Sequence, residues 1–413
     1  MLYFLIVGEI STKLKNVWIY LEENLMKTKR ILALTLAIAL AFSFTFATTA
    51  FANTPQVTVT VDGERVTFAE QQPIIVDGRT LVPVRSVFEF MGFEVDWDAD
   101  AEQATISNDY YEIVLTAGST TFTTNGTSGT LDVPAQLTNG SILLPVRAVL
   151  ESVGYNVYWD HANRTVIVLS MSAMDLLLKS EAAMADITGF DSTMEMTMSM
   201  AVEGETINSV VTGNVSTHLD PIAMRMTMTT VMTVAGETVE MDIDSYIIHE
   251  GDYLIVYMYM MGEWVKQTSP FSQELWDELM AMNTPEMSAE LYKSATVVGS
   301  ERIRNIDTWR VDVVMDFAGA VAMLEGMDGL ADMLDAGMFD GMGDVAATLW
   351  IAKDGFYTVR MDMDMTDMMA GMMAEMGITI SEVSLSMTSF NFNNPSPVVL
   401  PEAAADAVEM ELL

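Results

Sequence analysis

The sequence predicts an α+β protein with an N-terminal repeated module and a methionine-rich antiparallel sheet after it. The repeat is visible in "RTLVPVRSVFEFMGFEVDWD" at 79–98 and "SILLPVRAVLESVGYNVYWD" at 141–160. The sheet is indicated by strands in which methionine alternates with polar residues, as in "TMEMTMSM" at 193–200. Because successive side chains of a strand point to opposite faces, this alternation predicts one apolar and one polar face.

The two copies of the repeat are identical at ten of twenty aligned positions and lie 62 residues apart. A phrase repeated at a fixed offset is typical of a structural module. The shared positions used as markers are Pro83, Arg85, Gly92, Trp97 and Asp98, with Pro145, Arg147, Gly154, Trp159 and Asp160 in the second copy.

Each copy reads as a hairpin, a short helix and returning strands. Asp62-Gly63, Asp77-Gly78 and Asn139-Gly140 are turn signals between alternating apolar residues. After Pro83 and Pro145 the apolar spacing becomes three or four, which predicts helices of about two turns. Proline is tolerated in a first helical turn, and the two glycines supply the left-handed residue that ends a helix. Two such units sharing a sheet would bury more apolar surface than either alone.

Arg85 and Arg147 allow two interpretations, a binding site or a structural ion pair with an aspartate such as Asp98 or Asp160. We favour the structural pair, because arginine–carboxylate pairs are common in protein scaffolds.

The phrase "DGRTLVPVRSVFEFMGFEVDWD" resembles the copper amine oxidase N-terminal-like domain, a module of secreted bacterial proteins, over residues 56–170. The family name implies copper chemistry, which needs three histidine ligands and a tyrosine that matures to a quinone. This chain has only His161, His218 and His249, with no H-x-H pair, and "NDYYE" at 108–112 has the quinone-forming residues in the wrong order. Amine oxidase activity and a type-2 copper site are therefore not expected.

The C-terminal half begins with an amphipathic helix at 171–185 and continues as strands. Hairpin turns are predicted at 261–263, 305–307 and 354–355, and helices at 272–282, 286–293 and 317–339. The methionines that alternation places on one face are Met194, Met196, Met198, Met200, Met224, Met226, Met228, Met361, Met363 and Met365.

This half is similar to the LolA/LppX-type lipoprotein fold, and more narrowly to uncharacterised Gram-positive envelope proteins, over residues 171–395. The similarity rests on the opening helix, the methionine strands, "GEWVK" and "LWIAKDGFYTVRMDMDM". It implies a curved antiparallel half-barrel with helices on its concave face, and a hydrophobic ligand such as a lipid inside. The chain lacks the cysteine that anchors such lipoproteins.

Three interpretations of the methionines remain open. They fill an irregular core, they line a cavity that adapts to a lipid or apolar peptide, or they hold Cu(I) through Met-x-Met thioethers. No cofactor is predicted. The acids in "EGMDGLADMLDAGMFDGMGD" at 325–344 lack the spacing of an EF-hand loop, and we interpret this segment as a polar lid. Residues 396–413 read as an acidic flexible tail.

The first 52 residues read as processing sequence. Residues 26–52 have a basic start, an apolar run and an A-x-A pattern, which predicts a signal peptide cleaved after Ala52. Residues 1–25 precede this complete signal, and we interpret Met26 as the true start. The sequence thus predicts an extracellular or cell-surface protein without a stable transmembrane anchor.

The net charge of the chain limits which classes of partner it can bind. The chain carries 19 Lys and Arg against 58 Asp and Glu, a formal net charge of −39, and it has no cysteine. Such a surface repels nucleic acid, so we expect none as a partner. The absence of cysteine excludes disulfides and thiolate metal sites.

Two functions from different classes are compatible with these observations. In the first, the chain is a secreted, non-catalytic envelope protein whose half-barrel holds a hydrophobic small molecule or lipid, with the N-terminal domain docking on a cell-wall or envelope component. In the second, both domains are purely structural or adhesive. No nucleophile, zincin or phosphate-loop motif indicates an enzyme.

Overall fold

The structure is a computed structural model. It describes residues 56–409 except 77, 203–204, 261, 272–290, 317–318, 320–343 and 375–376. The predicted start, the signal peptide, the acidic lid apart from Asp344, and nearly all of the helices expected at 272–282, 286–293 and 317–339 lie outside these residues. Residues 292–293 of that middle segment belong to a strand, not a helix.

The two copies of the repeat fold alike. Each has a hairpin, a helix that follows directly on its second strand, and two returning strands. The hairpins share one sheet through β4 and β11, where Val82 pairs with Leu144. The returning strands belong to two other sheets, which also contain β7–β9 and β1–β2. The first copy comprises β3 Ile74–Val76, β4 Arg79–Pro83, α2 Val84–Phe90, β5 Glu94–Asp98 and β6 Gln103–Ser107. The second comprises β10 Gln136–Thr138, β11 Ser141–Leu144, α3 Val146–Glu151, β12 Asn156–Asp160 and β13 Thr165–Leu169. The remaining strands are β1 Thr58–Val61, β2 Glu64–Arg65, β7 Glu112–Thr116, β8 Thr121–Thr124 and β9 Thr127–Thr130.

Backbone geometry explains the marker prolines and glycines. Pro83 and Pro145 occupy the N-cap positions, one residue before the helices begin. Gly92 and Gly154 have φ of +85° and +89°, a conformation that glycine adopts without strain. Asp62-Gly63 and Asn139-Gly140 have positive φ at both residues, as a two-residue hairpin turn requires.

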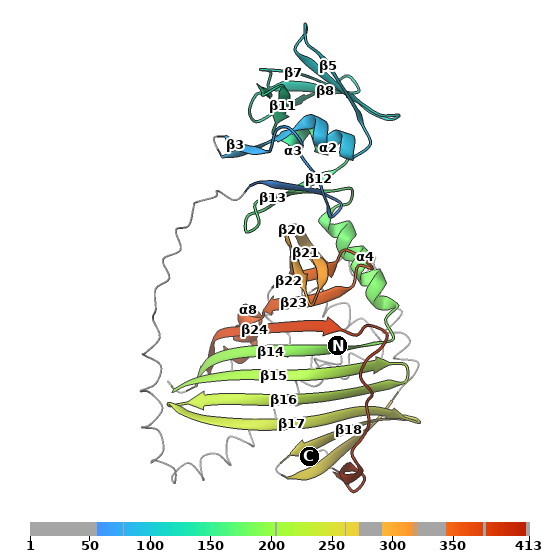
Figure 1. Ribbon diagram of the computed structural model, residues 1–413. Coiled ribbons are helices and arrows are strands. Elements are labelled where there is room, and N and C mark those ends of the chain that lie inside the picture. Colours follow the sequence, from blue (N-terminus) through green and yellow to red (C-terminus); the bar gives the residue numbers. More distant parts are fainter. Residues whose placement is uncertain are drawn as a thin grey trace, which may run out of the picture. The chain divides into compact units, whose positions relative to one another are not determined.

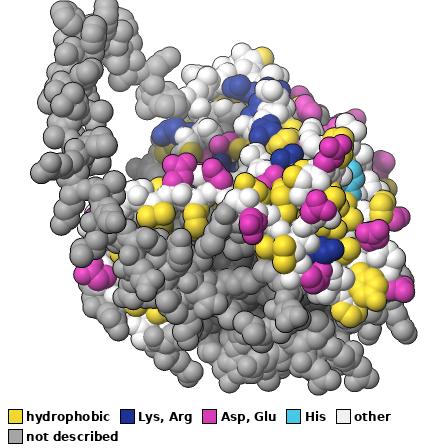
Figure 2. Space-filling model, turned by 90° about the horizontal axis from the view of Figure 1, so that it is seen from below, with side chains coloured by type: hydrophobic (Ala, Val, Ile, Leu, Met, Phe, Trp, Pro, Cys, Tyr) yellow, Lys and Arg dark blue, Asp and Glu magenta, His cyan; other side chains and the backbone are white. Residues whose placement is uncertain are grey.

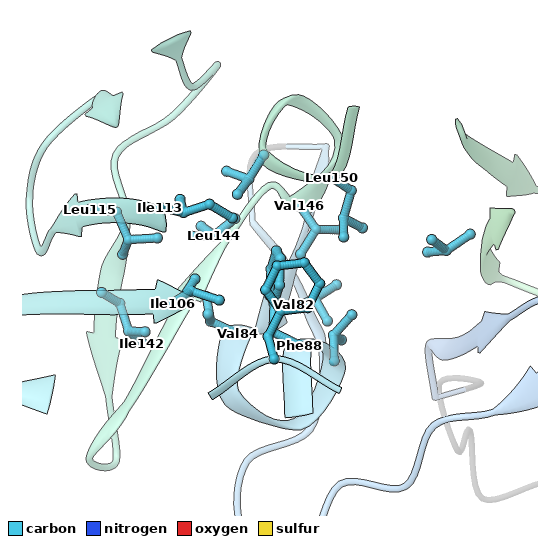
Figure 3. Close-up of a cluster of buried hydrophobic side chains, with 14 of the residues drawn as sticks. Val82, Val84, Phe88, Ile106, Ile113, Leu115, Ile142, Leu144, Val146 and Leu150 are labelled. Carbon is cyan, nitrogen blue, oxygen red and sulfur yellow. The ribbon is translucent and has the colours of Figure 1, made fainter. Parts of the chain in front are cut away.

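The module's core is built from the helical stripes that the sequence predicts. Val84 and Phe88 of α2 and Val146 and Leu150 of α3 point toward side chains of the surrounding strands (Figure 3). All four are at most 3% exposed. The markers Trp97 and Trp159 are partly buried and pack against the same cluster.

The predicted pairing of the marker arginines with the marker aspartates is wrong. Arg85 is exposed and its guanidinium contacts Glu89 one helical turn away, at 2.9 Å. Asp98 instead accepts hydrogen bonds from the N–H groups of Asp100 and Ala101, at 2.9 and 3.0 Å. Asp160 does the same for Ala162 and Asn163, at 3.0 Å each. The aspartates therefore cap the turns between the returning strands, since a short carboxylate reaches backbone two and three residues ahead.

The C-terminal half is one curled, antiparallel sheet, which has twelve strands within the described residues. Figure 1 shows β14–β17 as long arrows side by side, with β18 next to β17 and β20–β23 on the far side of β24. In sheet order the strands are β20 Tyr292–Ile303, β21 Ile306–Met315, β22 Val345–Ala352, β23 Thr358–Asp364, β24 Ile378–Phe390, β14 Gly189–Val202, β15 Glu205–Leu219, β16 Ile222–Val234, β17 Glu237–Glu250, β18 Tyr253–Met260, β19 Glu263–Pro270 and β25 Val408–Glu409. Among the described pairings of this sheet, only that of the short β25 with β19 is parallel.

Two described helices pack on the sheet's apolar face. The helix α4 Ala173–Ala185 starts at a capping box formed by Ser172 and Asp175 and buries Leu176 and Leu177 against residues of β20–β22 such as Val311. The helix α8 Thr366–Ala374 packs against β24. Its first residue is fixed by Asp364, which accepts a hydrogen bond from the Thr366 N–H at 3.0 Å.

Part of the predicted flexible tail is instead seated on the sheet. Asp191 of β14 accepts hydrogen bonds from the N–H and hydroxyl of Ser396, at 2.9 and 2.8 Å. Ala404, in the short helix η1 Glu402–Ala404, is fully buried, and β25 pairs with β19. Figure 1 shows this dark red segment running past the ends of β14–β17 toward β18. Prolines and acids indicated a loose tail, but small apolar residues between them supply a surface that packs.

In the part of the chain that the structure describes, no helix combines the length and the apolar character needed to cross a membrane.

Candidate functional site

The apolar face of the sheet is built by strand register. Met194 of β14 lies opposite Met387 of β24, and Met387 lies opposite Met361 of β23. Directly paired residues of neighbouring strands share a face, so three thioethers stand in one row across the sheet. On the next row Met196 pairs with Leu385, which pairs with Met363.

These methionines form one apolar cluster with α8. Met194 is 6% exposed and Met365 is 9% exposed, and both belong to one cluster with buried Val345, Val383 and Leu385. Other side chains pack around this centre while partly exposed. They include Met196, Met198, Met200, Met228 and Met363, together with Met369 and Met373 of α8.

The predicted site residues do not all meet in this cluster. Met361 packs mainly with the α4 side of the apolar face, and Met363 contacts both clusters. Met226 is 9% exposed and sits on the same face as Met228, two residues along β16. Met224 follows the same alternation near the start of that strand and is partly exposed.

A glycine that sequence reasoning missed makes room for two of the methionines. Gly213 of β15 lies between Met194 and Met228 in the register. A Cβ placed on Gly213 would stand 3.1 Å from Cγ of Met228 and 3.3 Å from Cγ of Met194. The missing side chain thus lets the two thioether side chains approach each other. Its signal in the sequence was a lone glycine inside a strand pattern.

The helix α8 was also missed. Its Met368 is 4% exposed and belongs to the centre of the cluster. The sequence "TDMMAGMMA" contains a glycine and no clear apolar stripe, and only the capping of Thr366 by Asp364 marks its start.

The opposite face of the sheet is polar and carries two hollows, of about 780 and about 610 Å³. The larger one is lined by two rows of paired polar residues and by the row between them, Met194, Gly213, Met228 and Ile243. The Thr193 row runs Arg360, Thr388, Thr193, Asn214, Thr227, Asp244, Tyr259. The Glu195 row runs Ser386, Glu195, Thr212, Thr229, Asp242. The smaller hollow lies beside it over β20–β24 and holds Asp312, Asp362, Asp364 and Glu382.

Hydrogen bonds hold the polar side chains in place. The Thr229 hydroxyl donates to Asp242 at 2.7 Å, and the guanidinium of Arg360 donates two bonds to Asp362 at 2.8 and 2.7 Å. The bond to Asp362 raises the pKa of Arg360 despite partial burial. Hydrogen bonds from Thr366 lower the pKa of Asp364, so this acid is firmly ionised near neutral pH.

Acidic side chains dominate the charge of the described surface. Figure 2 shows them spread among hydrophobic and uncharged residues on the face seen from below. This fits a chain with a formal net charge of −39.

The three histidines do not form a common site. His161 accepts a hydrogen bond from the Trp159 indole N–H at 3.2 Å in the module. His218 and His249 lie on β15 and β17, and the register places them on opposite faces, since His218 aligns with Ala223 and then Ile248. Among the described residues, no group of three or more His, Asp or Glu side chains is arranged to hold a metal ion.

Comparison with known families finds two matches. Residues 60–168 match the copper amine oxidase N-terminal domain. Residues 172–301 match a family of unknown function, DUF6612. The first match confirms the resemblance inferred from the doubled phrase. Among curated proteins no relative was found.

Solved structures give more distant likenesses. One is the lipoprotein LppX of Mycobacterium tuberculosis, with 18% identity and a TM-score of 0.32, covering 55% of this chain and 98% of that one. Another is LprF from Mycobacterium bovis, with 14% identity and a TM-score of 0.33, covering 55% of this chain and 96% of that one. Both agree with the resemblance to the LppX type drawn from the sequence. The chain is thus similar to a copper amine oxidase N-terminal domain followed by a family whose function is unknown.

Proposed function

We propose that this chain is an exported, non-catalytic envelope protein whose methionine-rich apolar face holds a hydrophobic ligand, a lipid or an apolar peptide. The observation that carries the proposal is the apolar face to which β14, β16, β23, β24 and α8 each contribute methionines. Met196, Met198, Met200 and Met228 lie at the edge of the cluster and are partly exposed, so they are available to a ligand.

Methionine suits this role for a physical reason. Its unbranched side chain rotates about three bonds and its sulfur is polarizable, so a methionine surface adapts to ligands of different shape. A leucine or phenylalanine face of the same area would fix one shape.

Native mass spectrometry of the intact protein purified from cells, followed by lipid extraction, tests the proposal. We expect co-purifying acyl species that leave the protein on denaturation. Protein without any bound species, and without uptake of a fluorescent fatty acid, would favour the purely structural or adhesive alternative.

Two adjacent substitutions provide a matched pair. Met196→Gln places an amide on the apolar face, whereas Thr197→Gln places the same amide on the polar face, one residue away on β14. Burying an amide without a partner costs about 1 to 3 kcal/mol. We expect fatty-acid affinity to fall about tenfold in Met196→Gln and to stay unchanged in Thr197→Gln. Equal losses in both would exclude the methionine face as the site.

The same protein can be titrated with Cu(I), because thioethers are soft ligands that this ion accepts. Stoichiometric Cu(I) binding that Met196→Gln abolishes would replace the lipid proposal with a copper one.

In this proposal the N-terminal module docks the protein on the cell surface. Cosedimentation of the intact chain with purified Gram-positive cell walls tests that role. Protein that stays in the supernatant at physiological salt would contradict it.

A further inference from the structure

The polar face of the sheet carries two rows of polar side chains that have no part in the proposed binding of a hydrophobic ligand. The Thr193 row crosses seven neighbouring strands from β23 to β18, and the Glu195 row runs beside it. Neighbouring strands lie about 4.8 Å apart, so the larger hollow is a long groove across the strands rather than a compact pocket.

We propose that this groove binds an extended, uncharged glycan. The proposal concerns the face opposite the methionines and is independent of the function proposed above.

The lining matches the hydrogen-bonding groups of a sugar chain. Five threonines, a serine and an asparagine offer both donors and acceptors, and Glu195, Asp242 and Asp244 accept bonds from ligand hydroxyls. Met194, Gly213, Met228 and Ile243 form the row between these two and also line the hollow, with side chains that alternation directs toward the other face of the sheet.

Charge excludes another class of ligand. The larger hollow is lined by three carboxylates and one guanidinium, that of Arg360, which is already bonded to Asp362. An anionic polymer such as a nucleic acid or a teichoic acid would meet net repulsion there. An uncharged polyol meets acceptors without that cost.

One end of the groove carries aromatic rings on which a sugar ring can stack. Tyr259 is 41% exposed, and its ring lies 5.4 Å from that of Trp264. Trp264 in turn lies 5.8 Å from Tyr246, over which Arg225 is placed at 5.4 Å. Tyrosine and tryptophan combine an apolar face with a polar edge, which complements the apolar face and hydroxyl rim of a pyranose.

The groove is also organised before a ligand arrives. The bonds of Thr229 to Asp242 and of Arg360 to Asp362 fix side chains at both sides of it. Side chains that are already held lose less rotational freedom on binding, so more of the contact energy appears as affinity.

Affinity electrophoresis of the intact protein tests the proposal. Its acidity gives high mobility in a native gel, and soluble β-glucan, xylan, mannan, galactan, starch and glycol chitin are cast into separate gels. We expect retardation by at least one of them. Thr227→Arg should weaken that retardation at least about tenfold, because the new side chain fills the groove between Asn214 and Asp244.

The matched control is Thr233→Arg, on the same strand and the same face but outside the hollow. It should leave the retardation unchanged while adding the same charge. Equal losses in both variants would overturn the location. No retardation by any of the six polysaccharides would overturn the proposal, and so would binding of oligolysine in their place, which would identify a basic peptide as the ligand. Retained fatty-acid uptake in Thr227→Arg keeps this outcome separate from a failure of the methionine face.

Discussion

At the scale of single residues, an aspartate at the same position of each repeat copy has the same structural role. Asp98 and Asp160 stand at equivalent positions and cap equivalent turns. Each turn closes with a residue at positive φ, Glu102 at 48° and Arg164 at 50°. Their surroundings differ, because Asp98 is exposed whereas Asp160 is 1% exposed and also accepts bonds from the Asn163 side chain and the Ser300 N–H, at 2.8 and 3.3 Å.

Truncating the two aspartates should therefore have unequal effects. Asp160→Ala leaves buried donors without a partner, and we expect the free energy of unfolding to fall by about 2 to 3 kcal/mol. Asp98→Ala removes the same cap where water can replace it, and we expect roughly 1 kcal/mol or less. Urea unfolding followed by tryptophan fluorescence measures both. Equal losses would mean that the bonds beyond the turn contribute nothing.

The carboxylate of Asp160 also makes the stability of the protein depend on pH. Burial alone would raise the pKa of Asp160, but hydrogen bonds from Asn163, Ser300 and Ala162 outweigh burial and lower it. The stability contributed by this carboxylate is then fully present above its unfolded pKa of about 3.9, and it is lost as pH falls through the lower folded value.

Asp160→Asn should consequently be less stable than wild type at pH 7, and the difference should shrink below about pH 4. Thermal unfolding between pH 3 and pH 7 measures this. A difference that stays constant over that range would show that the charge of Asp160 is not what stabilises the native state.

At the scale of elements, the methionine strands depend on close packing between β14, β15 and β16. Gly213 has an extended backbone, so its role is to leave space rather than to supply an unusual conformation. A Cβ there would also stand 2.9 Å from the carbonyl oxygen of Thr227 on β16.

Gly213→Ala should destabilise the sheet by about 1 to 3 kcal/mol, because an added methyl in a packed position forces its neighbours apart. Met228→Ala in the same chain removes the Cγ that the methyl would meet. We expect the double variant to be more stable than the sum of the two single losses predicts, by at least about 0.5 kcal/mol. If the two losses in unfolding free energy simply add in denaturant unfolding, the added methyl does not clash with Met228.

The elements also show what sequence can and cannot predict. Asp62-Gly63 and the alternation around Met196 were readable because turn chemistry and strand period are local. Three other features could not be predicted, because each depends on a partner brought near by the fold. They are the role of Gly213, the turn capped by Asp160 and the hydrogen bonds from Ser396 to Asp191. The polar groove was missed for the same reason, since its rows exist only after β23, β24 and β14–β18 are paired.

At the scale of the whole molecule, the sheet has an apolar face and a polar face, separated only by the thickness of its backbone layer. Thioethers collect on one face, while hydroxyls, carboxylates and a few cations collect on the other. Strand alternation alone produces this separation. The proposed hydrophobic ligand and the proposed glycan would thus use opposite surfaces, and neither proposal requires the other to hold.

The molecule's charge has a consequence for its stability as a whole. With 58 acidic against 19 basic residues, the compact state suffers self-repulsion that the expanded chain relieves. Salt at 0.1 M shortens the Debye length to about 10 Å and screens this repulsion. We expect the Tm to rise by several degrees between 10 and 500 mM NaCl, and equally in KCl. A rise produced by micromolar calcium alone would show that specific ion binding, rather than screening, stabilises the fold.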